Sequence, residues 1–220
     1  MNLENMTIDD LENRLKHANL TKSRMLIKDD LERHFETIRK FAFKHAAEFQ
    51  EALKSKAKLK AFSDESGIEE NYLVILIREI NSWIKKPNKM VDFTLISKEF
   101  IDIFVSSGMK TTLQVYNQLM EKDGPKKIKS LLGCTDDQLS FIISLIDLSR
   151  VRWVNHTFAE MLYETGFKSS KDVMMADWQD MYDKINVYNK EHEIYRGKIG
   201  ENDMMLVIAS AKDVPQDLIQ

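Results

Sequence analysis

Apolar positions recur with helical spacing along almost the whole chain. Leu31, Phe35 and Ile38 stand four and three residues apart, which places them on one face of a helix. Wider apolar stripes in FIDIFV, LVILIREI and FIISLIDL predict helices that are buried between neighbours. No segment combines strict apolar and polar alternation with β-branched residues and flanking turn signals. The sequence therefore predicts an all-α protein of about ten to thirteen helices.

A short motif recurs three times within this helical pattern. Its clearest copies are IDIFVSSGMKTTLQVY, around Gly108, and AEMLYETGFKSSKDVM, around Gly166. TIRKFAFKHAAEFQEAL is a third copy, in which Ala42 takes the place of the glycine. A second motif, a glycine six residues before a leucine, keeps step with the first and begins at Gly67, Gly133 and Gly200. Self-similarity of this kind indicates tandem copies of one supersecondary unit.

The repeat predicts the domain organisation. We expect three units, residues 24–90, 91–149 and 150–212, with a helical leader at 1–23 and a frayed tail at 213–220. Because each unit of a tandem array buries its apolar face on its neighbours, the units should pack into one continuous helical body.

The glycines of the first motif fall where helices should end. Gly108 follows an amphipathic run and suits the left-handed residue just beyond a helix C-terminus. Thr111 and Gln114 then predict a capping box at the next helix, and Ser169 with Asp172 and Thr135 with Gln138 repeat that spacing. In the first copy Ala42 replaces the glycine and His45 replaces the hydroxyl residue, so this turn should be strained or built differently.

A helix, a short turn with a glycine, an apolar residue and a lysine, and a second capped helix resemble a degenerate helix-hairpin-helix unit. Over residues 20–190, from SRMLIKDDLERHF through KLKAFSDESGIEENYLVIL to DLSRVRWVNHTFAEMLYETGFKSSKDV, the chain resembles an uncharacterised bacterial family, a domain of unknown function with such repeats. Typical modules have two glycines in the hairpin and bind a nucleic-acid phosphate through loop amides. Here Lys44, Lys110 and Lys168 replace the second glycine, and a lysine can attract phosphate as a point charge.

The net charge of −3 hides an uneven distribution. Between Arg14 and Lys60 the chain has thirteen Lys or Arg against six Asp or Glu, which is typical either of an anionic partner or of a solvated helical face. The densest basic run consists of Lys54, Lys56, Lys58 and Lys60. These lysines could follow phosphates or lie at a helix terminus whose dipole they complement. In RVRWVNHTF, Trp153 could stack on a base, but a place in the core together with Phe158 is favoured.

Signatures of catalysis, metal binding and membrane insertion are missing from the sequence. The five histidines and single cysteine show no zinc-ligand spacing, and there is no P-loop, GxGxxG or GxSxG motif. There is no apolar run of about eighteen residues and no secretory signal. We therefore expect a cytoplasmic, non-enzymatic protein without metal, cofactor or membrane association. Two functions stay open: nucleic-acid binding through the hairpin and basic-run lysines, and a scaffold whose unit surfaces or methionine-rich patches bind another protein.

Overall fold

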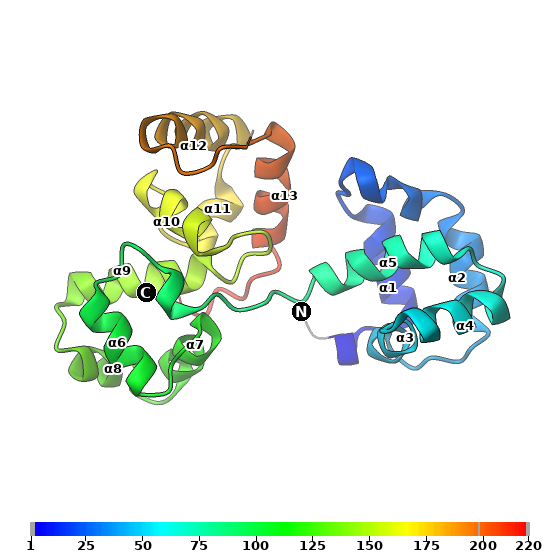
Figure 1. Ribbon diagram of the computed structural model, residues 1–220, viewed down its shortest axis with the longest axis horizontal. Helices are drawn as coiled ribbons and strands as arrows, with labels where there is room; N and C mark the ends of the chain where they lie inside the picture. Colours follow the sequence, from blue (N-terminus) through cyan, green and yellow to red (C-terminus); the bar gives the residue numbers. More distant parts are fainter. Residues whose placement is uncertain (1–2, 198, 219–220) are drawn as a thin grey trace. The chain divides into compact units, whose positions relative to one another are not determined.

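The computed structural model describes residues 3–197 and 199–218, and its regular structure is helical (Figure 1). The described residues form thirteen α-helices and three short 3-10 helices: η1 Leu3–Asn5, α1 Ile8–His17, η2 Lys22–Lys28, α2 Leu31–Arg39, α3 Ala46–Ala52, α4 Lys56–Ser66, α5 Glu70–Ser82, η3 Met90–Asp92, α6 Lys98–Ser106, α7 Thr112–Met120, α8 Gly124–Leu132, α9 Asp136–Leu148, α10 His156–Glu164, α11 Ser170–Met175, α12 Trp178–His192 and α13 Glu201–Ala211. An isolated bridge between Lys89 and Thr111 is the only β-type pairing in these ranges. The all-α prediction is confirmed.

The chain divides into two compact units, Met1–Ile84 and Lys85–Gln220, where the sequence predicts one continuous body. Each unit has its own apolar core. Phe35, Phe49 and Leu76 are fully buried in the first core, and Phe104, Val115 and Ile146 are fully buried in the second. The expected leader belongs to the first core, because Leu11 and Leu15 of α1 are fully buried there.

The element order follows the repeated motif. Each copy forms a helix, a tight turn and a second helix, and two further helices follow, so that the copies span α2–α5, α6–α9 and α10–α13. The copies around Gly108 and Gly166 share the second unit. The expected tail is held in place over its described part: Val214 is buried, and Arg150 donates to the Pro215 carbonyl at 3.0 Å.

The two glycine turns have the same backbone geometry. Gly108 and Gly166 are left-handed, with φ of 86° and 97°. After each glycine, the next amide donates to a carbonyl near the end of the preceding helix: Met109 N–H to the Phe104 carbonyl at 2.8 Å, and Phe167 N–H to the Leu162 carbonyl at 2.9 Å. These bonds satisfy carbonyls that have no partner within the helix. Ala42 is also left-handed, with φ of 53°, so the strain expected of the first copy is present.

The caps of the following helices agree with their sequence signals in most places. Thr111 with Gln114 and Thr135 with Gln138 form the predicted capping boxes of α7 and α9. The Ser169 hydroxyl accepts the Asp172 amide at 3.1 Å. His45 precedes α3 without a side-chain cap. The second motif is less uniform than the sequence suggests, because Gly67 and Gly133 end helices in the left-handed region, whereas Gly200 begins α13 with φ of −103°.

Two buried carboxylates join the second and third copies. Asp147 at the end of α9 accepts the Ser170 amide of α11 at 2.6 Å, and Glu160 of α10 accepts the amides of Thr94 and Leu95 at 2.6 and 2.7 Å. These hydrogen bonds connect one copy to the next. They also stabilise the buried negative charges, because each carboxylate accepts from backbone amides. Together with the shared apolar core, they hold the two copies in one unit.

Candidate functional site

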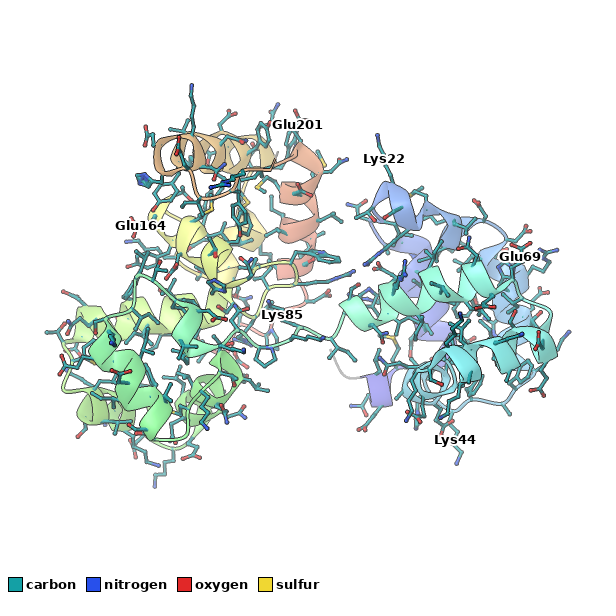
Figure 2. The ribbon with its side chains drawn as sticks, viewed as in Figure 1. Lys22, Lys44, Glu69, Lys85, Glu164 and Glu201 are labelled. Carbon is teal, nitrogen blue, oxygen red and sulfur yellow. The ribbon has the colours of Figure 1, made fainter. Side chains whose placement is uncertain are left out.

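The three hairpin lysines occupy equivalent places, one residue before the N-cap of α3, α7 and α11. All three side chains are exposed, and Figure 2 marks Lys44 at the surface of the first unit. Lys110 and Lys168 belong to the second unit. The Lys168 ammonium lies 5.5 Å from the ring centroid of Tyr163, within range of a cation–π contact.

The backbone amides of these lysines already have acceptors inside the hairpins. Lys44 N–H donates to the Glu48 carboxylate at 2.8 Å, and Lys110 N–H donates to the Gln114 amide oxygen at 2.9 Å. The Lys168 amide makes the corresponding bond to Asp172 at 3.0 Å. In each hairpin a side-chain oxygen thus already accepts the hydrogen bond that the lysine amide could otherwise donate to a phosphate oxygen.

The first amide of the second helix of each hairpin is also paired. The Ala46 amide donates to the Met6 carbonyl at 2.8 Å, and the Thr112 amide donates to the Asn88 carbonyl at 2.9 Å. The Ser170 amide donates to Asp147 at 2.6 Å. A phosphate could bind the amides of the three lysines or of these first helical residues only by displacing their internal acceptors, whereas the lysine ammonium groups are exposed.

The basic run Lys54–Lys60 spans the junction between α3 and α4. Lys54 and Lys58 both pair with Glu51, at 2.5 and 2.8 Å. Lys56 is the first residue of α4, and Lys58 and Lys60 follow in its first turns. Cations at a helix N-terminus oppose its dipole, so the predicted complementarity is wrong for the α4 lysines.

Tertiary contacts offset much of the charge of the basic region 14–60. Arg39 donates to Asp9 at 2.8 Å and also pairs with Glu12. Arg24 pairs with the buried Glu79. These acids lie outside the basic region in the sequence, and residues 1–84 carry fourteen Lys or Arg against fifteen Asp or Glu. The first unit is therefore close to neutral.

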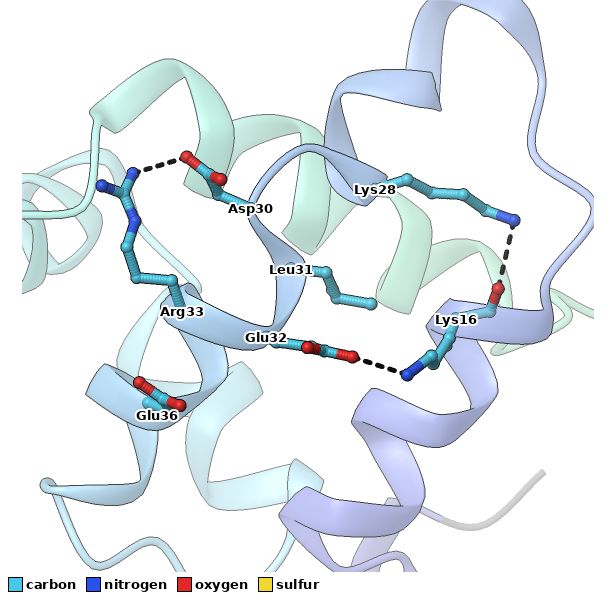
Figure 3. A pocket seen from close by; sticks show the side chains of 7 residues that line it. All are labelled: Lys16, Lys28, Asp30, Leu31, Glu32, Arg33 and Glu36. Atoms are coloured by element: carbon cyan, nitrogen blue, oxygen red, sulfur yellow. Dashed lines mark hydrogen bonds and ion pairs between the residues drawn. The ribbon is translucent and has the colours of Figure 1, made fainter.

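A charged hollow of about 540 Å³ lies between α1, η2 and α2, above the buried Leu31 (Figure 3). Lys16 donates to Glu32 at 2.6 Å, and Arg33 pairs with Asp30 at 2.8 Å. Lys28 donates to the carbonyl of Lys16 at 3.2 Å. Because the cations of this hollow already contact acceptors within it, the hollow has little free capacity for an anion.

The basic and aromatic stretch at 150–158 does not form one platform. Phe158 is buried, as predicted, but Trp153 is 41% exposed with φ of 74°, so the favoured core position is wrong for Trp153. The Arg152 guanidinium lies 4.3 Å from the Trp153 ring centroid. Arg150 turns to the interior, where it pairs with Asp147 at 3.0 Å and Asp217 at 2.8 Å.

Over residues 3–197 and 199–218, no group of three or more His, Cys, Asp or Glu could hold a metal ion. Cys134 is buried. Within the same ranges no helix has the length and apolar content needed to cross a bilayer. Fold and turns thus define an all-α protein whose helices are joined by capped turns. Comparisons with protein-family models, with curated proteins and with solved structures find no match to the chain.

Proposed function

We propose that this chain is a non-enzymatic binding protein whose ligand is another protein. The observation that carries the proposal is the outer face of α7. Leu113 and Met120 are 50% and 46% exposed there, and their separation of seven residues places them on the same side of the helix. Val115 and Leu119 of the same helix are buried in the core.

The composition of α7 sets it apart from an ordinary surface helix. Its sequence TLQVYNQLM contains no charged residue, although solvent-facing helix surfaces are usually rich in charge. Leu131 of the adjacent α8 is a further apolar side chain that is 42% exposed. Exposed apolar side chains that gather on neighbouring helices, unlike ones that are scattered singly, are typical of a protein–protein contact.

We also infer that the three helix–turn–helix copies are degenerate helix-hairpin-helix units. Their left-handed turns and second-helix starts support this inference, as does the equivalent lysine in each copy. The internal acceptors of the lysine amides, among them Glu48 and Asp172, favour a structural use of these hairpins over phosphate binding.

Nucleic-acid binding is the second candidate function. Its best support is the start of α4, where Lys56 and Lys60 are exposed and have no ion-pair partner within the described part of the chain. Since a cation destabilises a helix N-terminus, Lys56 is better suited to an external anion than to the helix itself. The near-neutral first unit weighs against this candidate.

The primary test compares capture of proteins from a lysate of the producing cells by the wild type and by the L113K/M120K variant. We expect the variant to lose the proteins that the wild type retains, because two ammonium groups would face an apolar partner surface. E99K, an exposed substitution on α6 that changes the net charge by the same amount, is the matched control and should retain them. Equal capture by the wild type and L113K/M120K would contradict the proposal for α7.

Labelled DNA and RNA, titrated at two salt concentrations, test the second candidate. We expect no binding that weakens with salt. Salt-dependent binding that is lost in K44E/K110E/K168E or in K56E/K60E would favour the nucleic-acid function instead.

A further inference from the structure

A second apolar surface lies between the C-terminal end of α10 and α12. It is a groove of about 520 Å³, and Figure 2 marks Glu164 at the α10 end that borders it. On α12, Asp183, Val187 and Glu191 follow one another at intervals of four residues and thus lie in line along one helix face. This line is the contribution of α12 to the groove, with Val187 between the two acids.

The floor of the groove is apolar and partly open to solvent. Val187 is 57% exposed, although Met181 and Ile185 of the same helix are fully buried in the core. Tyr188 lies beside Val187 and is half-buried, with its ring 4.1 Å from that of His192. A valine and a tyrosine ring together offer a surface on which an aliphatic stem can lie.

Carboxylates surround this floor. Glu164, Asp183 and Glu191 line the groove and have no ion-pair partner among residues 3–197 and 199–218. The groove's own cation, Lys184, is already paired with Asp180 at 2.8 Å and lies 5.4 Å from the Phe167 ring centroid. The groove therefore has a net negative rim around an apolar floor.

Glu164 is placed where it does not help its own helix. It is the last residue of α10, and an acid at a helix C-terminus is repelled by the partial negative charge of the terminal carbonyls. The corresponding residues, two before the turn position, are Lys40 in the first copy and Ser106 in the second. The acid thus belongs to the third copy alone, and hairpin formation does not require it.

We propose that this groove docks a basic, amphipathic segment of a partner protein. The aliphatic stem of an Arg or Lys side chain of that segment packs on Val187 and Tyr188. Its positive charge then lies near the three rim carboxylates, those of Glu164, Asp183 and Glu191. A bare metal ion fits less well, because the acids do not converge into a ligand cluster. The inference rests on the proposed function in one respect only, namely that the ligand is a protein.

The test is a fluorescence-anisotropy titration of the full chain with labelled peptides of about 15 residues, a length at which helices begin to form in water. One peptide has Leu and Arg at helical spacing, a second has Glu in place of Arg, and a third has Ser in place of Leu. We expect the Leu/Arg peptide to bind at least about tenfold more tightly than either of the others, since both the charge and the apolar face contribute.

The variant E164Q/D183N/E191Q removes the rim charge with little change in side-chain shape. It should weaken binding of the Leu/Arg peptide at least about tenfold. V187D, which makes the floor polar, should also weaken it. The matched control E99Q/D102N/D137N removes three exposed acids elsewhere in the second unit and should bind like the wild type. Circular dichroism checks that each variant is folded.

Equal binding of all three peptides, or an equal loss in the E99Q/D102N/D137N control, would overturn the groove assignment. The α7 variant L113K/M120K separates this inference from the proposed function, because it leaves the groove intact and should still bind the Leu/Arg peptide. If the wild type does not bind that peptide but L113K/M120K still loses captured proteins, the groove inference fails and the proposed function stands.

Discussion

At the residue scale, the three hairpin turns differ most at the position that must be left-handed. Gly108 and Gly166 adopt this conformation without strain, whereas Ala42 places a Cβ in a region that L-residues rarely enter. A Cβ added at Gly108 would have no neighbouring atom within 4 Å. The difference between alanine and glycine at these turns is therefore one of backbone energy and not of packing.

The expected consequence is a pair of opposite stability changes. Ala42→Gly should stabilise the first unit by about 0.5–1 kcal/mol, because relief of the left-handed strain exceeds the entropy that glycine adds to the unfolded chain. Gly108→Ala should destabilise the second unit by about 1 kcal/mol. Urea unfolding followed by circular dichroism measures both.

Ser107→Ala is the control for this pair, since its φ of −84° suits any L-residue and its free energy of unfolding should change little. A loss of stability in Ala42→Gly would show that the methyl group of Ala42 contributes more than its backbone costs.

At the scale of elements, one lysine fixes the segment that enters the second unit. Lys85 donates from its ammonium to the Val154 carbonyl, just before α10, at 2.6 Å. Burial lowers the pKa of Lys85 to about 8. The folded pKa is thus below the unfolded value, so the unfolded state binds more protons between the two pKa values.

The free energy of unfolding of the second unit should consequently rise as the pH increases from about 8 toward 10, where the cost of burying the charge is removed. The expected gain is on the order of 1 kcal/mol after allowance for the solvent-exposed part of the side chain. Burial raises the pKa values of Tyr116, Tyr188 and Tyr195, which has the opposite effect above about pH 10, so the measurement stays below that pH.

Lys85→Met and Lys85→Arg are the comparison variants for urea unfolding between about pH 7 and pH 9.5. Neither side chain titrates in this window, so neither variant should show the rise. An equal rise in the wild type and both variants would assign the pH dependence to another group.

At the scale of the whole molecule, two separate cores replace the single array that the repeat predicts. The first copy closes its core with α1, and its buried Glu79 accepts the Trp83 indole N–H at 2.8 Å within the same unit. The second and third copies share one core and the carboxylate contacts of Asp147 and Glu160. Stability should follow these cores and not the repeat boundaries.

Fragments test this expectation. Residues 1–84 and 85–220 should each unfold cooperatively, because each contains a complete core. Residues 85–149 should not, since the division exposes α9 side chains such as Leu145 and Ile146 and leaves Asp147 without its Ser170 donor. Near-ultraviolet circular dichroism and urea unfolding measure the difference, and cooperative unfolding of 85–149 would contradict it.

Several local features could be predicted from the sequence because they depend on residues a few positions apart. The helices follow from apolar spacing, and the capping boxes at Thr111 and Thr135 follow from residues three positions apart. The packing reason for glycine at position 124, by contrast, appears only in the structure. A Cβ there would lie 2.2 Å from the Gln118 carbonyl oxygen, so glycine permits the close approach of α8 to the end of α7.

The proposed binding surfaces could not be predicted from the sequence, because they depend on contacts between residues that are far apart in the chain. The sequence identified Lys44, Lys110 and Lys168 as equivalent. It did not indicate that the first amide of each following helix donates to a distant acceptor, which is the Met6 carbonyl, the Asn88 carbonyl or the Asp147 carboxylate. Likewise, nothing in the spacing of Glu164 and Val187 indicates that α10 and α12 border a shared open groove.

By itself the sequence determined the helices, their caps and the threefold repeat, because these depend on backbone conformation and hydrogen bonds within a few residues. Only the tertiary structure decided how many cores the repeat makes, which hairpin amides remain available and which charges are offset, because those properties depend on partners brought together by packing.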